Sequence, residues 1–287
     1  MLRWSETEIP DGSSCPAENQ GYETVKSKPG HLGPEFAAQF SDASVAAHYH
    51  LRPPYPEEVF TILAELIVDS PRAVLDVGAG TGEIARRLID FVDRVDAVDP
   101  SVAMIEQGRG MPGGRSAKIS WITGFAEDAP LVPPYALITA GASLHWMQWE
   151  TVLPRLRDAL SAHGVLAIIE SHERRAPWAS ALQEIIPRYS TNRRFRPLNV
   201  VDEIERRGLF ETLGRTMTAP VRHLQPTTDY VASFHARNGF SLDRMTPEAA
   251  SAFDRAALKI VSPYANDAGR LELQIVGEVV WGRPAPG

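Results

Sequence analysis

One glycine-rich stretch, VLDVGAGTGEIARRL at residues 74–88, constrains the fold more than any other part of the sequence. A short apolar run leads into a turn with glycine at every second position, Gly78, Gly80 and Gly82, and a helix-like segment follows. Glycine at such a turn lets bare backbone come close to a ligand. The pattern therefore predicts the connection between a strand and a helix of an α/β sheet, with a binding site at the turn.

Predicted strands and helices alternate along the chain. The predicted strands are 73–77, 94–98, 118–122, 135–140, 165–170, 211–218 and 271–282, and the predicted helices are 57–68, 83–91, 101–107, 149–162, 178–190 and 200–208. Alternation at this spacing is typical of a parallel sheet with helices on both faces. We therefore predict an α/β fold with a doubly wound, mostly parallel, seven-stranded Rossmann-like sheet and an antiparallel strand pair at its edge.

The same pattern divides the chain into parts. We predict a flexible N-terminal extension over residues 1–35 and cap helices over residues 36–72. The ligand-binding core is predicted to comprise residues 73–219 together with 270–287. A helical insert over residues 220–269 is expected to lie as a lid over the carboxyl ends of the strands, where it would cover a substrate.

Charge disfavours a nucleic-acid partner. The net charge is −7, and there is no long basic run, so binding driven by phosphate contacts is not expected. Six arginines do fall between Arg174 and Arg196. They form either an ordinary solvated surface or a rim that attracts an anionic substrate.

Cysteine usage and hydropathy point to the cytoplasm. Cys15 is the single cysteine, so no internal disulfide can form, which fits a reducing compartment. Residues 1–30 lack the apolar core of a signal peptide, and no apolar run is long enough for a membrane helix. No cluster of His, Cys and Asp has metal-ligand spacing, so no catalytic metal is expected.

Three ligand classes compete for the glycine turn. A phosphate-binding loop needs a lysine and a hydroxyl residue after its last glycine, but Glu83 and Ile84 follow Gly82 here. A dinucleotide site needs the spacing G-x-G-x-x-G, and this turn reads G-x-G-x-G. The remaining class is a nucleoside without a phosphate.

Two carboxylates support that third class. Asp76 lies just before the turn and could accept from a ligand ammonium, directly or through water. Asp99 ends the second predicted strand, where a carboxylate can accept from both hydroxyls of a ribose. A cationic amino acid joined to a ribose satisfies both groups, and S-adenosylmethionine is such a molecule.

Four segments in this order resemble motifs of the class I S-adenosylmethionine-dependent methyltransferases. They are VLDVGAGTGE at 74–83, VDAVDPS at 95–101, WITGFAEDAPL at 121–131 and YALITAGASLHWMQW at 135–149. The resemblance extends over about residues 45–170. Within it, AAHYHLRPPYPEEVF at 46–60 resembles the N-terminal helix and loop of small-molecule enzymes of the trans-aconitate and ubiquinone-biosynthesis types.

The resemblance implies S-adenosylmethionine as cofactor, S-adenosylhomocysteine as product, and a set of cofactor-binding residues. These are Tyr49, Arg52, Asp76, Gly78, Gly80, Gly82, Asp99, Pro100, Met104, Ala126, Glu127, Gly141 and Trp146. Tyr49 and Arg52 are expected near the donor's carboxylate, and the amide of Ala126 near adenine. Where the family often has aspartate this chain has Phe125, so Glu127 or Asp128 is expected to contact the adenine amino group instead.

The acceptor is predicted to be a small, apolar or aromatic molecule, such as a secondary metabolite, methylated on oxygen or carbon. His145 is the first candidate base, because its pKa suits proton abstraction near neutrality, although it could instead pack against the adenosine. His172 is a second candidate. Aromatic and histidine side chains that could line the substrate pocket are Trp149, Trp178, Phe234, His235 and Phe240.

Other functions remain open at this point. A non-catalytic S-adenosylmethionine-binding module, a relative that uses the bound sulfonium to assist a cyclisation, and a nicotinamide-dependent oxidoreductase are the alternatives. We expect a small-molecule partner, no nucleic acid and no membrane. The leader within residues 1–35 is long enough to swap onto a neighbouring subunit, so the protein could form a homo-oligomer.

Overall fold

The structure is a computed structural model that describes residues 28–174 and 176–286. Most of the predicted extension therefore lies outside the described residues. The strands are β1 Ala73–Val77, β2 Arg94–Asp99, β3 Ile119–Thr123, β4 Tyr135–Gly141, β5 Leu160–Glu173, β6 Phe210–Met217, β7 Val221–Pro226 and β8 Arg270–Pro284. In the described part of the chain they form one sheet of order β3-β2-β1-β4-β5-β8-β6, with β7 also paired to β8.

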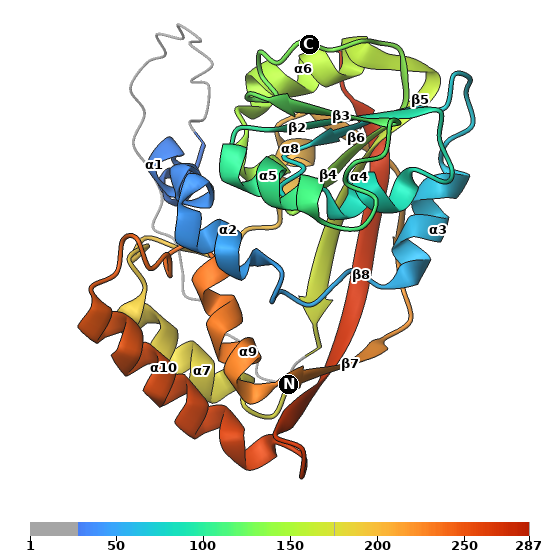
Figure 1. Cartoon of the computed structure of the whole chain (residues 1–287). Helices are drawn as coiled ribbons and strands as arrows, with labels where there is room; N and C mark the ends of the chain where they lie inside the picture. Colours follow the sequence, from blue (N-terminus) through green and yellow to red (C-terminus); the bar gives the residue numbers. More distant parts are fainter. Residues whose placement is uncertain (1–27, 175, 287) are drawn as a thin grey trace, which may run out of the picture.

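The strand directions confirm the predicted mostly parallel α/β fold, although the described residues form eight strands rather than the predicted seven. β1 to β5 pair in parallel, whereas β8 runs antiparallel to β5, β6 and β7. The helices are α1 Pro34–Ala37, α2 Ala43–Tyr49, α3 Glu57–Glu65, α4 Glu83–Leu88, α5 Val102–Gly110, α6 Trp149–Ala159, α7 Ala179–Tyr189, α8 Val200–Arg206, α9 Thr227–Ala232 and α10 Pro247–Val261. The sheet carries helices on both faces, as Figure 1 shows.

Alternation of side chains along the strands explains the two helical layers. Val74 packs with the apolar residues of α3 and α4, whereas the next residue, Leu75, packs with those of α6 and α8. Successive strand residues point to opposite faces, and both faces of this parallel sheet are covered, so β1 is apolar almost throughout. Ser101 begins α5 as a cap, as predicted, by accepting from the Met104 amide at 3.3 Å.

The antiparallel edge differs from the prediction. Residues 221–226 form strand β7, although the sequence predicted a helical insert from residue 220 onward. β6 pairs with residues 278–284 of β8, and β7 pairs with residues 270–275. The two short strands thus lie end to end along one edge of β8. Residues 221–226 become a strand because they pair with the long strand β8. A short polar segment has little strand propensity of its own from which this could be predicted.

The helices α7, α9 and α10 form a second apolar cluster, which we call the lid. In Figure 1 the lid lies at the lower left, beyond the end of the sheet that carries β7. Phe253 is fully buried at its centre, with ring centroids 4.6 Å from Phe240 and 5.3 Å from Phe234. Leu271, Leu273 and Ile275 of β8 belong to the same cluster. Strand β8 is therefore shared by the sheet and the lid.

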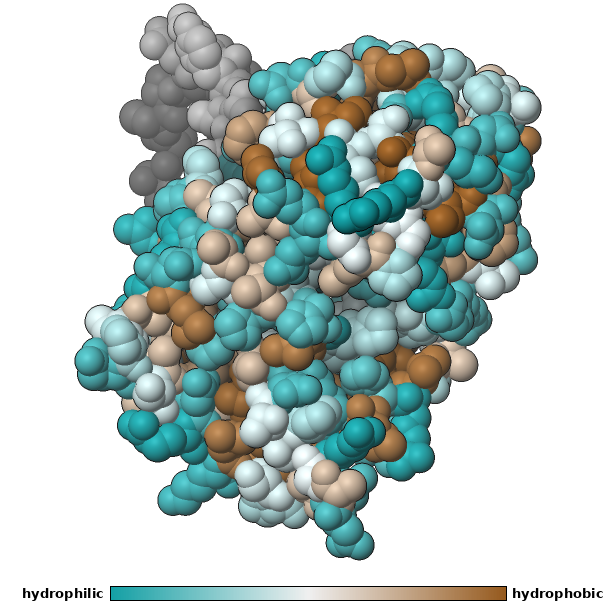
Figure 2. Space-filling view, viewed as in Figure 1, coloured by the Kyte–Doolittle hydropathy of each residue, from teal (hydrophilic) through white to brown (hydrophobic). Residues whose placement is uncertain are grey.

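The visible surface carries no extended apolar area. Figure 2 shows hydrophobic side chains scattered in small groups among hydrophilic ones over both the sheet and the lid. None of the helices within the described ranges is long and apolar enough to cross a membrane.

Candidate active site

The glycine turn between β1 and α4 needs glycine for two physical reasons. Gly78 and Gly82 have φ values of +65° and +71°, a left-handed conformation that strains other residues. A Cβ on Gly78 would also lie 2.4 Å from Cβ of Ser143, and one on Gly82 would lie 2.3 Å from the Trp121 ring. The turn therefore packs its bare backbone against β3 and the loop after β4.

Asp99 is fixed at the end of β2 by this turn. Its Oδ2 accepts from the Gly80 amide at 2.8 Å, and its Oδ1 accepts from the Ser101 amide at 2.8 Å. Burial raises the pKa of Asp99, while the two amides lower it. Each carboxylate oxygen keeps lone-pair capacity for a further donor, which suits a pair of ribose hydroxyls.

A cavity of about 560 Å³, here called the first cavity, opens beside this carboxylate. It brings together ten residues predicted to bind the cofactor, namely Tyr49, Gly78, Gly80, Asp99, Pro100, Met104, Ala126, Glu127, Gly141 and Trp146. Sequence reasoning missed the contribution of the N-terminal segment, where Pro34, Ala37 and Phe40 also line the wall. No motif marks that segment, and it reaches the cavity through tertiary packing alone.

Three residues predicted to bind the cofactor do not line the first cavity. Asp76 is buried beneath the turn, where Oδ2 accepts from the Ala85 amide at 3.2 Å and Oδ1 from Thr139 Oγ1 at 2.8 Å. Burial raises the pKa of Asp76 to about 7. Its visible role is to join β1 to the start of α4, rather than to meet a ligand ammonium directly.

The other two are Gly82 and Arg52. Gly82 precedes α4 and packs against Trp121. The Arg52 guanidinium stacks 5.2 Å from the Tyr49 ring and donates to the Tyr49 hydroxyl at 3.3 Å. Arg52 thus orients a residue that does line the cavity.

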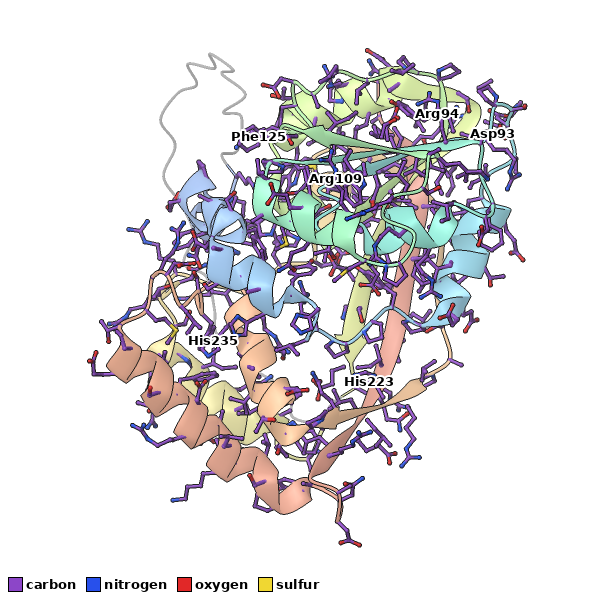
Figure 3. The ribbon with its side chains drawn as sticks, in the orientation of Figure 1. Asp93, Arg94, Arg109, Phe125, His223 and His235 are labelled. Atoms are coloured by element: carbon purple, nitrogen blue, oxygen red, sulfur yellow. The ribbon has the colours of Figure 1, made fainter. Side chains whose placement is uncertain are left out.

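The loop after β3 also lines the first cavity. Phe125, labelled in Figure 3, is 61% exposed, and Ala126 beside it is buried. Glu127 accepts from the Gln148 amide at 2.7 Å, which ties this loop to the one after β4. Asp128 lines the cavity and is exposed, so of the two acidic residues it is the less engaged in protein contacts.

His145 and Trp146 form a wall between two cavities. They lie in the 3₁₀ turn Leu144–Trp146 with ring centroids 4.7 Å apart. Trp146 lines the first cavity, whereas His145 lines the second. Burial, together with the charges of Lys28 and Arg52, lowers the pKa of His145 to about 4. A neutral imidazole of such low basicity serves as a packed wall better than as a proton acceptor.

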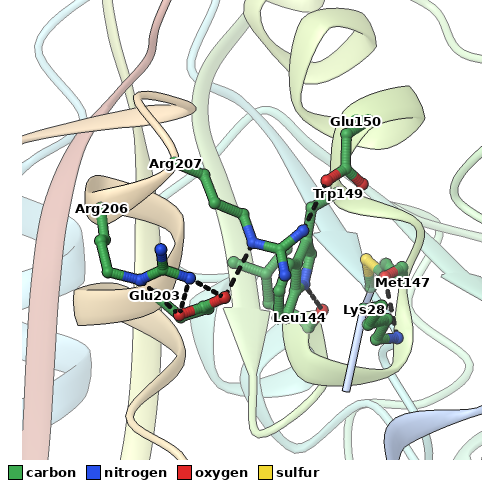
Figure 4. A network of polar contacts seen from close by, with 8 residues as sticks. All are labelled: Lys28, Leu144, Met147, Trp149, Glu150, Glu203, Arg206 and Arg207. Atoms are coloured by element: carbon green, nitrogen blue, oxygen red, sulfur yellow. Dashed lines mark hydrogen bonds and ion pairs between the residues drawn. The ribbon is translucent and has the colours of Figure 1, made fainter. Parts of the chain in front are cut away.

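Trp149 supports this wall from behind and lines neither cavity. It is fully buried, and its Nε1 donates to the Leu144 carbonyl at 2.8 Å. Figure 4 shows the indole beside Arg207, whose guanidinium lies 5.0 Å from the ring and pairs with Glu150 at 2.8 Å. Lys28 donates to the Met147 carbonyl at 3.0 Å. The predicted substrate contact is therefore a brace for the turn that carries His145 and Trp146.

The second cavity has a volume of about 500 Å³ and lies against β5 and β8. His145 and His172, the two predicted catalytic residues, both line it. His172 is paired through Nε2 with Oε2 of Glu278 at 3.0 Å. Glu170 also lines this cavity and was missed from the sequence. Its position at the carboxyl end of a parallel strand was the signal that could have found it.

The remaining predicted pocket residues lie inside the lid. Trp178, Phe234 and Phe240 are at most 3% exposed and line neither cavity. His235, labelled in Figure 3 within the lid, has both ring nitrogens 2.9 Å from partners, the Phe240 carbonyl and Asp254. These side chains form a core because three short helices need their own apolar interior.

The described residues contain no group of three or more His, Cys, Asp or Glu side chains placed to hold a metal ion.

Comparison with known proteins agrees with this geometry. Residues 74–164 match the family described as "Methyltransferase domain". An uncharacterized methyltransferase of Mycobacterium tuberculosis is 30% identical over 148 residues, which cover 51% of this chain and 58% of the relative. A malonyl-[acyl-carrier protein] O-methyltransferase of Anoxybacillus flavithermus is 33% identical over 87 residues, covering 30% of this chain and 33% of the relative. The chain thus spans little more than half the length of the first relative.

Solved structures share the fold. One named as a type II methyltransferase from Anaeromyxobacter dehalogenans has a TM-score of 0.59 at 22% identity and covers 82% of this chain and 99% of its own. One from Bacillus halodurans, also named as a methyltransferase, has a TM-score of 0.50 at 14% identity and covers 80% of this chain and 100% of its own. Residues 74–164 are therefore similar to a methyltransferase domain, and the chain shares its fold with solved structures named as methyltransferases.

Proposed function

We propose that the protein transfers a methyl group from S-adenosylmethionine to an oxygen or carbon atom of a small, apolar or aromatic acceptor, such as a secondary metabolite. One observation carries this proposal. Two cavities of similar size lie on either side of the neighbouring side chains His145 and Trp146, and the predicted cofactor residues line one of them while titratable side chains line the other. Such an arrangement suits a donor and an acceptor that must approach each other.

The first cavity fits the cofactor through its own residues. Asp99 would hold the ribose hydroxyls, and the Ala126 segment would lie along the adenine. Tyr49, oriented by Arg52, would lie toward the amino-acid end. When bound, the cofactor supplies an activated methyl group on a sulfonium. The protein's part is to align donor and acceptor and to exclude water.

The second cavity supports an acceptor of limited size and partly apolar character. Ile168 and Val280 line one side, and a segment around Leu198 lines another. Such a site would hold an aromatic or aliphatic framework by burial of apolar area. Net charge −7 supports a small molecule rather than a nucleic acid, and we propose that the protein acts in the cytoplasm.

A calorimetric titration tests the cofactor assignment. We expect S-adenosylhomocysteine to bind with micromolar affinity and neither oxidised nor reduced nicotinamide dinucleotide to bind. Nicotinamide binding would favour the oxidoreductase. Binding of S-adenosylhomocysteine with no turnover on a broad acceptor panel would favour a non-catalytic module or a cyclisation-assisting relative.

A further inference from the structure

The second cavity is lined by one histidine nitrogen and one carboxylate that have no hydrogen-bond partner among the described residues. Nε2 of His31 is buried and has no hydrogen-bond partner, and the His31 side chain lines the cavity while the residue is 8% exposed. The Glu170 carboxylate lines the same cavity and has no hydrogen bond or ion pair within residues 28–174 and 176–286. The two side chains come from segments far apart in the sequence.

Unpaired polar groups of this kind are costly to a folded protein. Leaving a buried donor or acceptor unsatisfied costs about 1–3 kcal/mol, and native structures pair nearly all of them. The buried nitrogen of His31 therefore points to a ligand that supplies its missing partner, and the half-buried Glu170 carboxylate lines the same cavity.

Three basic side chains that line this cavity already have partners within the protein. His172 pairs with Glu278 at 3.0 Å, and Arg215 lies 3.5 Å from Glu278 and 3.7 Å from Asp202. Arg196 donates to the Phe195 carbonyl at 2.8 Å. An anionic acceptor would therefore place its charge beside the Glu170 carboxylate, and like charges at short range repel.

We propose that the second cavity binds a neutral acceptor with two hydrogen-bonding groups on an apolar framework, with a hydroxyl at Glu170 and a hydroxyl or carbonyl at His31. Glu170 is then a catalytic residue, the base for that hydroxyl. This inference rests on the proposed methyl transfer. The aliphatic residues Ile168 and Val280 contact the framework between the two polar ends.

The chemistry of the step balances without a further reactant. The acceptor hydroxyl gives its proton to the Glu170 carboxylate, and the oxygen forms a bond to the methyl carbon as the sulfur–carbon bond breaks. The products are a methyl ether, a neutral S-adenosylhomocysteine and a protonated Glu170. Proton transfer of this kind contributes about 10²–10⁴-fold to rate when the base has a suitable pKa.

The surroundings of Glu170 suit this role. Burial raises the pKa of Glu170, and Glu278 raises it further, whereas His172 and Arg52 lower it. The carboxylate is thus a stronger base than an exposed glutamate. His145, with its pKa lowered to about 4, is the weaker base in the same cavity.

His31 supplies the second contact in a neutral form. Burial and the charge of Arg196 lower its pKa, while a hydrogen bond with the Arg196 backbone raises it in part. A neutral imidazole nitrogen can either donate or accept, so a hydroxyl or a carbonyl would satisfy it. The Phe195 ring packs edge-on at 5.9 Å and fixes the imidazole plane.

Three probes test the acceptor class: a naphthalenediol with one hydroxyl on each ring, naphthol and naphthoate. Each is titrated calorimetrically into the full chain saturated with S-adenosylhomocysteine. We expect the diol to bind tightest and naphthoate weakest. Glu170→Gln and His31→Leu should each weaken the diol about tenfold, the value for losing one hydrogen bond to a buried group.

Glu173→Gln is the matched control. Glu173 lies on the same strand but on the opposite face, where it accepts from the Tyr230 hydroxyl at 3.2 Å. We expect it to bind the diol as the parent does. Release of S-adenosylhomocysteine from S-adenosylmethionine and the diol should rise with pH through the Glu170 titration in the parent, and this rise should be absent in Glu170→Gln.

Equal diol affinity in the parent, Glu170→Gln and His31→Leu would overturn the inference. So would tightest binding of naphthoate, no binding of any probe, or a bound diol that is never methylated. In each of those cases the proposed function stands if S-adenosylhomocysteine itself binds. Failure of S-adenosylhomocysteine to bind would overturn the proposed function as well.

Discussion

The two cavities are built in different ways, although they share a wall. The first is formed largely by loops that follow β1, β2, β3 and β4, and its key carboxylate is fixed by neighbouring backbone amides. The second is formed by side chains from β5, β8, the N-terminal segment and residues 195–201. The difference teaches that a cofactor site can be encoded by short local motifs, whereas an acceptor site depends on tertiary assembly.

The largest expected effect is a loss of stability in the lid that leaves cofactor binding unchanged. Phe253→Ala should lower the free energy of unfolding by about 3–5 kcal/mol, because it removes a fully buried aromatic ring from the lid core. The affinity for S-adenosylhomocysteine should stay unchanged at a temperature where the variant is folded. Denaturant unfolding and calorimetry measure the two quantities. A large loss of affinity would show that the lid core acts directly on the first cavity.

Gly78→Ala tests whether the first cavity depends on backbone geometry. The strained φ costs about 1–3 kcal/mol, and the new Cβ would meet Ser143, so affinity for S-adenosylhomocysteine should fall about 100-fold. Gly208→Ala is the matched control, since Gly208 has φ +71° but open space around it. Both variants should lose some stability, and Gly208→Ala should bind like the parent. Equal binding by both would remove the geometric argument.

Asp99→Asn tests the charge in the first cavity. We expect S-adenosylhomocysteine to bind about 10–100-fold more weakly, in line with about 1.5–3 kcal/mol for a hydrogen bond to a charged group. Asp90→Asn, the same change at an exposed position in the turn before β2, serves as control. Parent-like affinity in Asp99→Asn would mean that the ribose is held elsewhere.

The smallest expected effect is the contribution of His145 to the pH dependence of stability. The folded-state pKa of His145 is about 4, below its ordinary value of 6.5, so between these pH values the unfolded chain binds more protons. Stability should therefore fall as the pH drops below 6.5, by about 1–2 kcal/mol at about pH 5. His145→Gln should lack this part of the loss, and the exposed His50→Gln should retain it. Identical pH curves for all three proteins would show that His145 is well solvated.

The sequence correctly predicted those elements whose structure depends mainly on residues close to one another in the chain. The strand 73–77 was predicted with the bounds that the structure shows, and the Ser101 cap forms as expected. β5 was predicted to end at residue 170 but continues to Glu173, because pairing with β8 extends it beyond its apolar run. Residues 221–226 were wrongly predicted as helical for the same reason.

The site shows the same limit. Gly78 and Asp99 belong to two short motifs at the ends of successive strands, so their meeting in one cavity could be predicted. Trp178 and Phe234 were predicted to line the substrate pocket because they are aromatic, but aromatic character cannot distinguish a pocket lining from a core. His31 carries no local signal, and its position depends on how the N-terminal segment packs across the second cavity.

Strand β8 has a mechanical consequence. One half of it pairs with β6 in the sheet, and the other half pairs with β7 and contributes Leu271 and Ile275 to the lid core. β5 runs beside it from Leu166 to Glu173 without interruption. Displacement of the lid must therefore bend hydrogen-bonded strands instead of rotating about a slack linker. The sheet itself therefore resists displacement of the lid, because such a motion would strain the pairing of β8 with its neighbours.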